Sequence, residues 1–249
     1  MPRYELRPLS TGEILDAALG IYRTRFAVLV SIAVVTQGIP TVINAYTEVS
    51  GGVLLRPGLW FLGIVLGVVG GLLAAGATVW VISETYLGRE AEVGDALGYA
   101  FSRAGSLLVA GIVKYLLVAI GFVLLFVPGI IVLCGLSVVS QIVVLERLNG
   151  PASVGRAWEL TRGYRGKAFG LGIVVLLLFY LPIFGFGILA AALPSMAAPL
   201  LVAGQALGLV IYPVVVCTFT LYYYDLRVRK EAFDLELLHT QLTGEFRAA

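Results

Sequence analysis

Six long runs of apolar residues with almost no charge dominate this sequence. A helix rises 1.5 Å per residue, so about 20 apolar residues are needed to cross the hydrocarbon core of a bilayer. Runs of about that length cover residues 26–46, 59–83, 106–127, 128–145, 168–193 and 200–223. A soluble core does not bury runs of this kind, so the sequence predicts a membrane protein with six transmembrane helices.

Composition supports this class of protein and excludes others. Of the 249 residues, 59% are hydrophobic and only 13% are charged, whereas a soluble domain carries about 25% charge. The runs are apolar on every face, unlike the alternating segments of outer-membrane barrels, so an all-α fold is expected. The net charge of +2 is too small to indicate a nucleic-acid partner. Cys134 and Cys217 lie within runs and are expected to be buried apolar side chains.

The basic residues predict how the chain is oriented. With six spans and a cytoplasmic N-terminus, every Lys and Arg except Arg56 and Lys114 falls in or beside a cytoplasmic segment. The positive-inside rule therefore predicts that both termini are cytoplasmic. The first run follows a charged amphipathic stretch and is longer than the apolar core of a secretory signal, so it is expected to be a retained span.

A short amphipathic segment precedes each odd-numbered run. Side chains at helical spacing form a stripe in each segment: Ile14, Ala17, Ala18, Ile21 and Tyr22; Val93, Ala96, Leu97, Ala100 and Phe101; Val154, Ala157, Trp158 and Thr161. This spacing predicts three short helices that lie in the cytoplasmic membrane interface. Ser10 and Glu13 predict a capping box at the first helix, and Ser153 is a candidate cap for the third.

An acidic residue ends each even-numbered run. These rim acids are Glu84, Glu146 and Asp225. Together with the short helices, they predict one membrane domain over residues 1–249, built from three repeats of an interfacial helix and a helical hairpin. The predicted repeats cover about 10–84, 92–146 and 152–225, followed by a cytoplasmic tail at 226–249. The alternative is that polytopic proteins commonly carry acids and short helices at their cytoplasmic rims.

Three stretches carry a family resemblance. They are RPLSTGEILD at 7–16, LE at 145–146 with AWELTRG at 157–163, and YYDLRVRKE at 223–231. Together they resemble the glycerophosphoryl diester phosphodiesterase membrane-domain family of bacteria. The resemblance implies a six-span module of the bacterial plasma membrane, in the stand-alone form that lacks the catalytic barrel.

The sequence does not predict an enzyme. A phosphodiesterase barrel needs about 250 residues and has no room beside six spans. The only histidine, His239, lies in the tail, and the zinc-protease, phosphate-loop and serine-hydrolase motifs are missing from the sequence. We therefore expect no catalytic residue, no metal site and no cofactor.

Lys114 is the most informative single residue, because a charge within a span is costly and marks a functional hypothesis. One interpretation turns it toward the bundle interior, where it meets a lipid phosphate, an anionic substrate, Glu84 or Glu146. The other lets its long side chain reach back to the cytoplasmic interface. The sequence leaves both open.

The rim acids also have two interpretations. Each pairs with a nearby arginine of an interfacial helix, with Arg147, Arg162 and Arg165 as the natural partners, or the three converge on a cation or proton site. Glycines four residues apart predict close helix packing and leave a homo-oligomer open: Gly63, Gly67 and Gly71; Gly166 and Gly170; Gly204 and Gly208. Three prolines within spans predict kinks: Pro40, Pro182 and Pro213.

The preferred function is therefore non-enzymatic. We expect a module that binds or organises membrane lipid, or supports a membrane-associated protein partner, through its cytoplasmic interfacial helices. The alternative is a small transporter for an anionic or lipid-like substrate, with Lys114 and the rim acids as its site.

Overall fold

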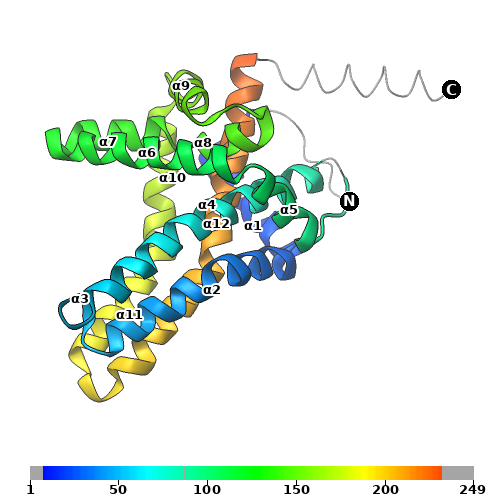
Figure 1. Ribbon diagram of the computed structural model, residues 1–249. Helices are drawn as coiled ribbons and strands as arrows, with labels where there is room; N and C mark the ends of the chain where they lie inside the picture. Colours follow the sequence, from blue (N-terminus) through cyan, green and yellow to red (C-terminus); the bar gives the residue numbers. More distant parts are fainter. Residues whose placement is uncertain (1–7, 87, 232–249) are drawn as a thin grey trace.

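The computed structural model describes residues 8–86 and 88–231, which form helices and no strand (Figure 1). Within these residues, six helical segments are long and apolar enough to cross a membrane. They are α2 (Phe26–Val49), α4 (Pro57–Tyr86), α6 (Ala104–Leu124), and the segments Phe126–Glu146, Arg165–Ala192 and Pro194–Glu231. The predicted all-α fold with six spans is confirmed. The predictions made for Arg3, Arg7, His239 and Arg247 concern residues outside the described part of the chain.

The last three spans each contain more than one element. The fourth consists of α7 (Phe126–Gly135), α8 (Val139–Gln141) and the π-helix η1 (Ile142–Glu146). The fifth consists of α10 (Arg165–Val175), the π-helix η2 (Leu176–Tyr180) and α11 (Leu181–Ala192). The sixth consists of the 3₁₀ turn η3 (Pro194–Met196) and α12 (Ala197–Glu231). The remaining helices are α1 (Thr11–Thr24), α3 (Gly52–Leu55), α5 (Val93–Ser102) and α9 (Gly150–Leu160).

The third and fourth spans form the expected tight hairpin, but its turn lies earlier than predicted. The chain turns at Leu125, whose backbone is extended, and Pro128 already lies in the first turn of α7. Proline is tolerated there because the first amides of a helix have no intrahelical acceptor. The two helices are close enough that a Cβ on Gly121 would lie 3.0 Å from the Gly129 Cα atom.

The three predicted short helices are present as α1, α5 and α9, each ahead of an odd-numbered span. The capping box of α1 is confirmed: the Glu13 amide donates to Ser10 Oγ, and the Ser10 amide donates to Glu13 Oε2. The predicted cap of α9 is wrong. That helix begins after Asn149, because Pro151 favours its first turn, and the Ser153 hydroxyl donates back to the Asn149 carbonyl within the helix.

The apolar stripes of these short helices pack against the spans. α1 contacts α12, α5 contacts α4, and α9 contacts α6. Fully buried stripe residues are Ile14, Ala18, Ile21, Ala96, Ala100, Ala157 and Thr161. Among the stripe residues, only Phe101 and Trp158 are exposed large side chains, with 61% and 38% of their surface accessible. The stripes therefore hold the helices to the bundle, while the threefold duplication stays a prediction.

Glycines bring α2 and α4 into close contact. A Cβ on Gly63 would lie 2.1 Å from Asn44 Oδ1, and one on Gly70 would lie 2.2 Å from the Thr36 carbonyl oxygen. Packing within one chain thus accounts for the glycines of α4. The pair at Gly166 and Gly170 differs from the prediction, because a Cβ there would meet no atom within 4 Å.

The three prolines occupy two kinds of position. Pro40 and Pro213 lie inside the continuous helices α2 and α12. Pro182 follows the π-helical turn η2, at the second residue of α11. Proline lacks an amide hydrogen and clashes with the carbonyl four residues earlier, and a wider turn relieves this conflict. The fifth span is therefore irregular just where it passes the centre of the molecule.

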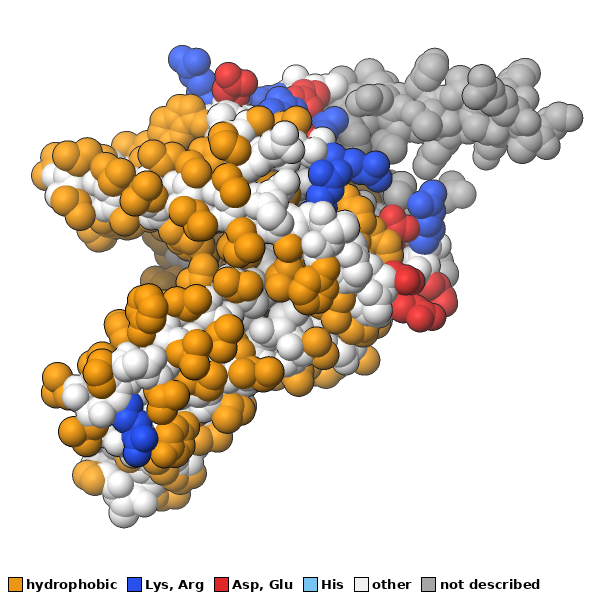
Figure 2. All heavy atoms as spheres, in the orientation of Figure 1, with side chains coloured by type: hydrophobic (Ala, Val, Ile, Leu, Met, Phe, Trp, Pro, Cys, Tyr) orange, Lys and Arg blue, Asp and Glu red, His pale blue; other side chains and the backbone are white. Residues whose placement is uncertain are grey.

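The spans form two arms that enclose a notch. The hairpin of α6 and α7 diverges from α2, α4 and α11, and α10 joins the two arms (Figure 1). Both arms carry mostly apolar side chains on the face shown, and charged side chains gather where the arms meet (Figure 2). Arg56 lies between α3 and α4 at the far end of one arm.

Candidate functional site

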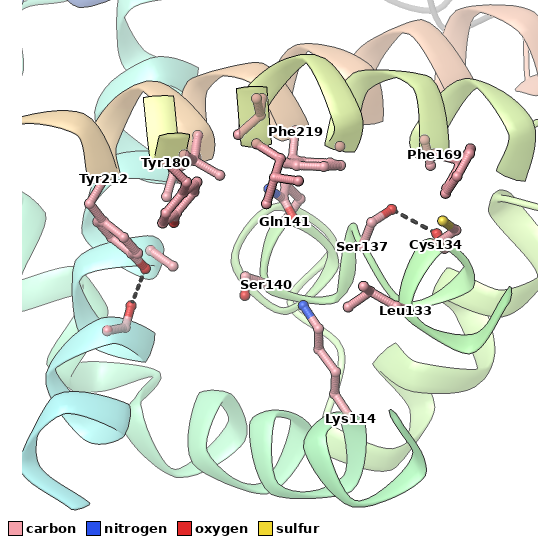
Figure 3. A pocket seen from close by; sticks show the side chains of 18 of the residues that line it. Lys114, Leu133, Cys134, Ser137, Ser140, Gln141, Phe169, Tyr180, Tyr212 and Phe219 are labelled. Atoms are coloured by element: carbon pink, nitrogen blue, oxygen red, sulfur yellow. Dashed lines mark hydrogen bonds between the residues drawn. The ribbon is translucent and has the colours of Figure 1, made fainter. Parts of the chain in front are cut away.

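A cavity of about 520 Å³ lies between the two arms (Figure 3). Its walls come from α6, α7 and α8, from α10 and η2, and from α4 and α12. Most lining residues are apolar, and the polar ones are Lys114, Tyr115, Ser137, Ser140, Gln141, Tyr180 and Tyr212. Its volume lies within the roughly 300–1,000 Å³ typical of small-molecule sites.

Lys114 extends from α6 into this cavity, toward Ser140 (Figure 3). It is the middle residue of the 21-residue helix α6, so its backbone lies roughly 15 Å from either end. The structure thus selects the interior position over the interfacial one. Among residues 8–86 and 88–231 the ammonium has no ion pair or hydrogen bond, and its recorded contact is the Tyr115 ring, with 6.0 Å from Nζ to the ring centroid.

Gln141 presents a carbonyl oxygen without a partner. The side chain is only 3% exposed, and its Nε2 donates to Thr220 Oγ1 at 3.4 Å. The Thr220 hydroxyl already donates its single hydrogen to the Val216 carbonyl at 2.7 Å, so toward Gln141 it can only accept. This fixes the amide orientation and leaves buried Oε1 without a hydrogen bond in the described part of the chain.

Two other polar groups of the lining are engaged in its walls. The Tyr212 hydroxyl donates to the Gly71 carbonyl at 2.7 Å and joins α12 to α4. The Ser137 hydroxyl donates to the Cys134 carbonyl at 2.8 Å (Figure 3). Cys134 and Cys217 are both buried free thiols, as expected. Lys114, Ser140 and Gln141 therefore remain as polar lining residues that can meet a ligand.

Glu146 is the centre of a charged cluster at the junction of the arms. It accepts from Arg156 Nε at 2.8 Å and from the Tyr223 hydroxyl at 3.0 Å. Arg227 lies 3.5 Å from Glu146 and also pairs with Glu231, as does Arg156. Burial alone would lower the pKa of Arg156, but its hydrogen bonds and ion pairs with both glutamates outweigh burial and raise the pKa above its usual value. The cluster therefore stays charged and joins α9 to α12.

Asp225, whose side chain is fully buried, is the centre of a second charged cluster. Its carboxylate accepts from Lys167 Nζ at 2.6 Å, from Arg229 Nε at 2.9 Å and from the Leu9 amide at 2.8 Å. Lys167 and Arg229 also donate to the Leu9 carbonyl. One carboxylate thus ties the segment before α1 to the fifth and sixth spans.

The predicted partners Arg147, Arg162 and Arg165 are wrong, although Glu146 does pair with an arginine of a short helix, Arg156 of α9. Glu84 pairs with Arg89 at 3.5 Å, and Glu146 and Asp225 pair as described above, so none of the three meets Arg147, Arg162 or Arg165. The reason is the rotation of α9, which turns Arg156 toward the bundle. The acids also do not converge, because the described residues hold no group of three or more acidic, His or Cys side chains able to share a metal ion.

The three arginines named from the sequence have other roles. The Arg165 guanidinium lies over the Trp158 ring, 3.5 Å from its centroid, and donates to the Trp158 carbonyl. The Arg147 carbonyl accepts from Arg103. Arg162 is exposed, and its amide donates to the Glu159 carbonyl. These side chains lie outside the lining of the cavity.

Sequence reasoning identified Lys114 but missed the site around it. Ser140, Tyr180 and Tyr212 are single polar residues in three different spans, and no spacing along the chain connects them. Gln141 is a polar amide within an apolar run, which by itself is only a weak indication of a binding site. Only the packing of the spans brings these residues to one cavity.

No protein-family model, curated protein or solved structure matches this chain. The resemblance to the glycerophosphoryl diester phosphodiesterase membrane-domain family therefore stays a prediction. Fold and site together define the class: over residues 8–86 and 88–231 this is a helical protein with six segments able to span a membrane and a cavity between them.

Proposed function

We propose that this protein binds a membrane lipid in the cavity between its two arms, without catalysing a reaction. The observation that carries the proposal is the position of Lys114: an ammonium with no partner among the described residues, in a largely apolar cavity at the middle of a span. A buried charge is costly unless something pairs with it. A lipid headgroup provides such a partner, and its chains match the apolar walls.

The exposure of the cavity walls supports a ligand that comes from the bilayer. Five lining residues also expose 39% to 52% of their surface outward: Tyr115, Leu133, Phe169, Ile173 and Leu176. On a chain that crosses a membrane, these side chains face acyl chains. A lipid therefore reaches the cavity along the notch without leaving an apolar environment.

The proposal includes a location and a secondary surface. The family resemblance implies a bacterial plasma membrane, and the distribution of basic residues favours an orientation with both termini cytoplasmic. The segment before α1 lies against the end of α12, which supports an arrangement with both ends on one side. Arg162, in the turn after α9, and Arg165, the first residue of α10, remain proposed contacts for anionic headgroups or for a membrane-associated protein partner.

The test is to fill the cavity and measure lipid retention. Gly172 lines the cavity, and a Cβ there meets no atom within 4 Å, so Gly172→Leu places a side chain in the ligand's space. Leucine in a helix interior is favoured over glycine by about 0.8 kcal/mol, so the variant is expected to fold. Native mass spectrometry in mild detergent should show co-purified lipid on the wild type and a large loss on Gly172→Leu.

The matched control is Gly170→Leu. Gly170 lies on the same helix, also has open space for a Cβ, and does not line the cavity. It should retain lipid like the wild type. Equal retention by wild type, Gly172→Leu and Gly170→Leu would contradict a lipid in this cavity.

A lipid transporter is the second candidate, and the depth of Lys114 favours it. A headgroup at this residue lies roughly 15 Å from either end of α6, which is midway on a path between leaflets. Vesicles containing the protein and fluorescent phosphatidylglycerol distinguish the candidates. If the protein transports lipid, the fluorescent lipid should exchange between leaflets faster with the wild type than with Lys114→Ala. Equal exchange rates would mean that the protein binds the lipid without transporting it.

A further inference from the structure

We infer that the cavity selects a lipid whose headgroup carries both an anionic group, held by Lys114, and a hydrogen-bond donor, held by Gln141 Oε1. This inference rests on the proposed function, because it specifies the headgroup of the lipid bound there. Two independent observations carry it: Lys114 and Gln141 both line the cavity, and among the described residues the Lys114 ammonium has no ion pair or hydrogen bond while the buried Gln141 Oε1 has no donor.

The anionic group follows from the charge of the lining. The cavity lining contains one lysine and neither Asp nor Glu. The three rim acids are held elsewhere: Glu84 pairs with Arg89, Glu146 with Arg156 and Asp225 with Lys167. The described residues therefore leave the Lys114 charge to be balanced by a ligand, and a phosphodiester group is the anion that a bilayer supplies.

The donor follows from the orientation of Gln141. Because Thr220 can only accept, the amide nitrogen is fixed toward it and Oε1 stays on the unpaired side. Leaving a buried carbonyl without a donor is unfavourable. A hydroxyl or primary amine on the headgroup satisfies it, whereas a quaternary ammonium has no hydrogen to donate.

These two requirements distinguish common lipids. Phosphatidylglycerol has a net negative phosphodiester and two hydroxyl donors. Phosphatidylcholine has a phosphodiester neutralised by a quaternary ammonium and no donor, and diacylglycerol has a donor but no charge. With identical acyl chains, we expect the order of retention to be phosphatidylglycerol first and the other two well behind.

The experiment measures this order by native mass spectrometry of the full chain in detergent micelles that contain equal amounts of the three lipids. The wild type should prefer phosphatidylglycerol over phosphatidylcholine by at least about tenfold, the value of one hydrogen bond to a charged group. Lys114→Gln should remove this preference, and Lys114→Arg should keep it. Gln141→Leu should reduce it, whereas Thr220→Val, which removes the same interhelical hydrogen bond but keeps the Gln141 carbonyl, should reduce it less.

The outcomes separate this inference from the proposed function. If the wild type retains all three lipids equally while Gly172→Leu loses them, the headgroup inference is wrong and lipid binding stands. If Gly172→Leu loses nothing, lipid binding in the cavity fails. Displacement of phosphatidylglycerol by millimolar glycerol 3-phosphate would make the ligand a soluble anion and would also overturn the inference. Gel filtration and thermal unfolding of every variant confirm that each one is folded.

Discussion

Asp225→Ala is expected to be among the most destabilising single substitutions at the charged end of the bundle. The Asp225 side chain has no exposed surface and binds Lys167, Arg229 and the Leu9 amide. Its removal leaves two cations and an amide without their shared acceptor. It also releases the segment before α1 from the sixth span.

The magnitude follows from how well water can replace the lost carboxylate. Breaking a buried ion pair by deleting one partner costs about 3–5 kcal/mol. The side chains of Lys167 and Arg229 are 14% and 27% exposed, so some water reaches them and the lower end applies, about 3 kcal/mol. For a chain of this length, each kcal/mol lowers the melting temperature by about 2–4 °C, so a decrease of about 6–12 °C is expected.

Thermal unfolding of the purified protein in detergent, followed by intrinsic tryptophan fluorescence, measures this decrease. Asp225→Asn should fall between the wild type and Asp225→Ala, because the amide still accepts from Leu9 but has lost the charge. Glu84→Ala is the matched control: its partner Arg89 is 68% exposed, and a surface pair contributes about 0–1 kcal/mol. Equal shifts for Asp225→Ala and Glu84→Ala would refute the reasoning.

Two further substitutions test the packing and the second charged cluster. Gly70→Ala should lower the melting temperature by several degrees, because its Cβ would lie 2.2 Å from the Thr36 carbonyl oxygen and α2 would have to move, whereas Gly172→Ala has open space and should not. Glu146→Ala should lower the melting temperature by less than Asp225→Ala does. The expected loss in free energy of unfolding is about 1–3 kcal/mol, because Glu231 still pairs with both arginines of that cluster. Thermal unfolding of each variant beside the wild type checks both, and a reversed order in either pair would contradict the packing described.

The regular features of the fold were predictable because they depend on local patterns. Long apolar runs specify spans, and a stripe of apolar residues at helical spacing specifies α1, α5 and α9. The capping box at Ser10 was readable for the same reason, since both of its hydrogen bonds lie within four residues. The start of α9 was misplaced because Ser153 has a capping side chain, whereas Pro151 is favoured in the first turn and the helix begins after Asn149, whose side chain makes no cap hydrogen bond.

The sequence by itself determined that Lys114 lies within a span and is therefore a candidate site, because hydrophobicity alone marks its position as costly for a charge. Only the tertiary structure decided which way the lysine points and what surrounds it. Partner choice among charges depends on the rotation of each helix, which turned Arg156 rather than Arg162 toward Glu146. The cavity exists because the α6–α7 hairpin diverges from the other spans (Figure 2), and an angle between helices is set by packing over the whole interface and by no single run of residues.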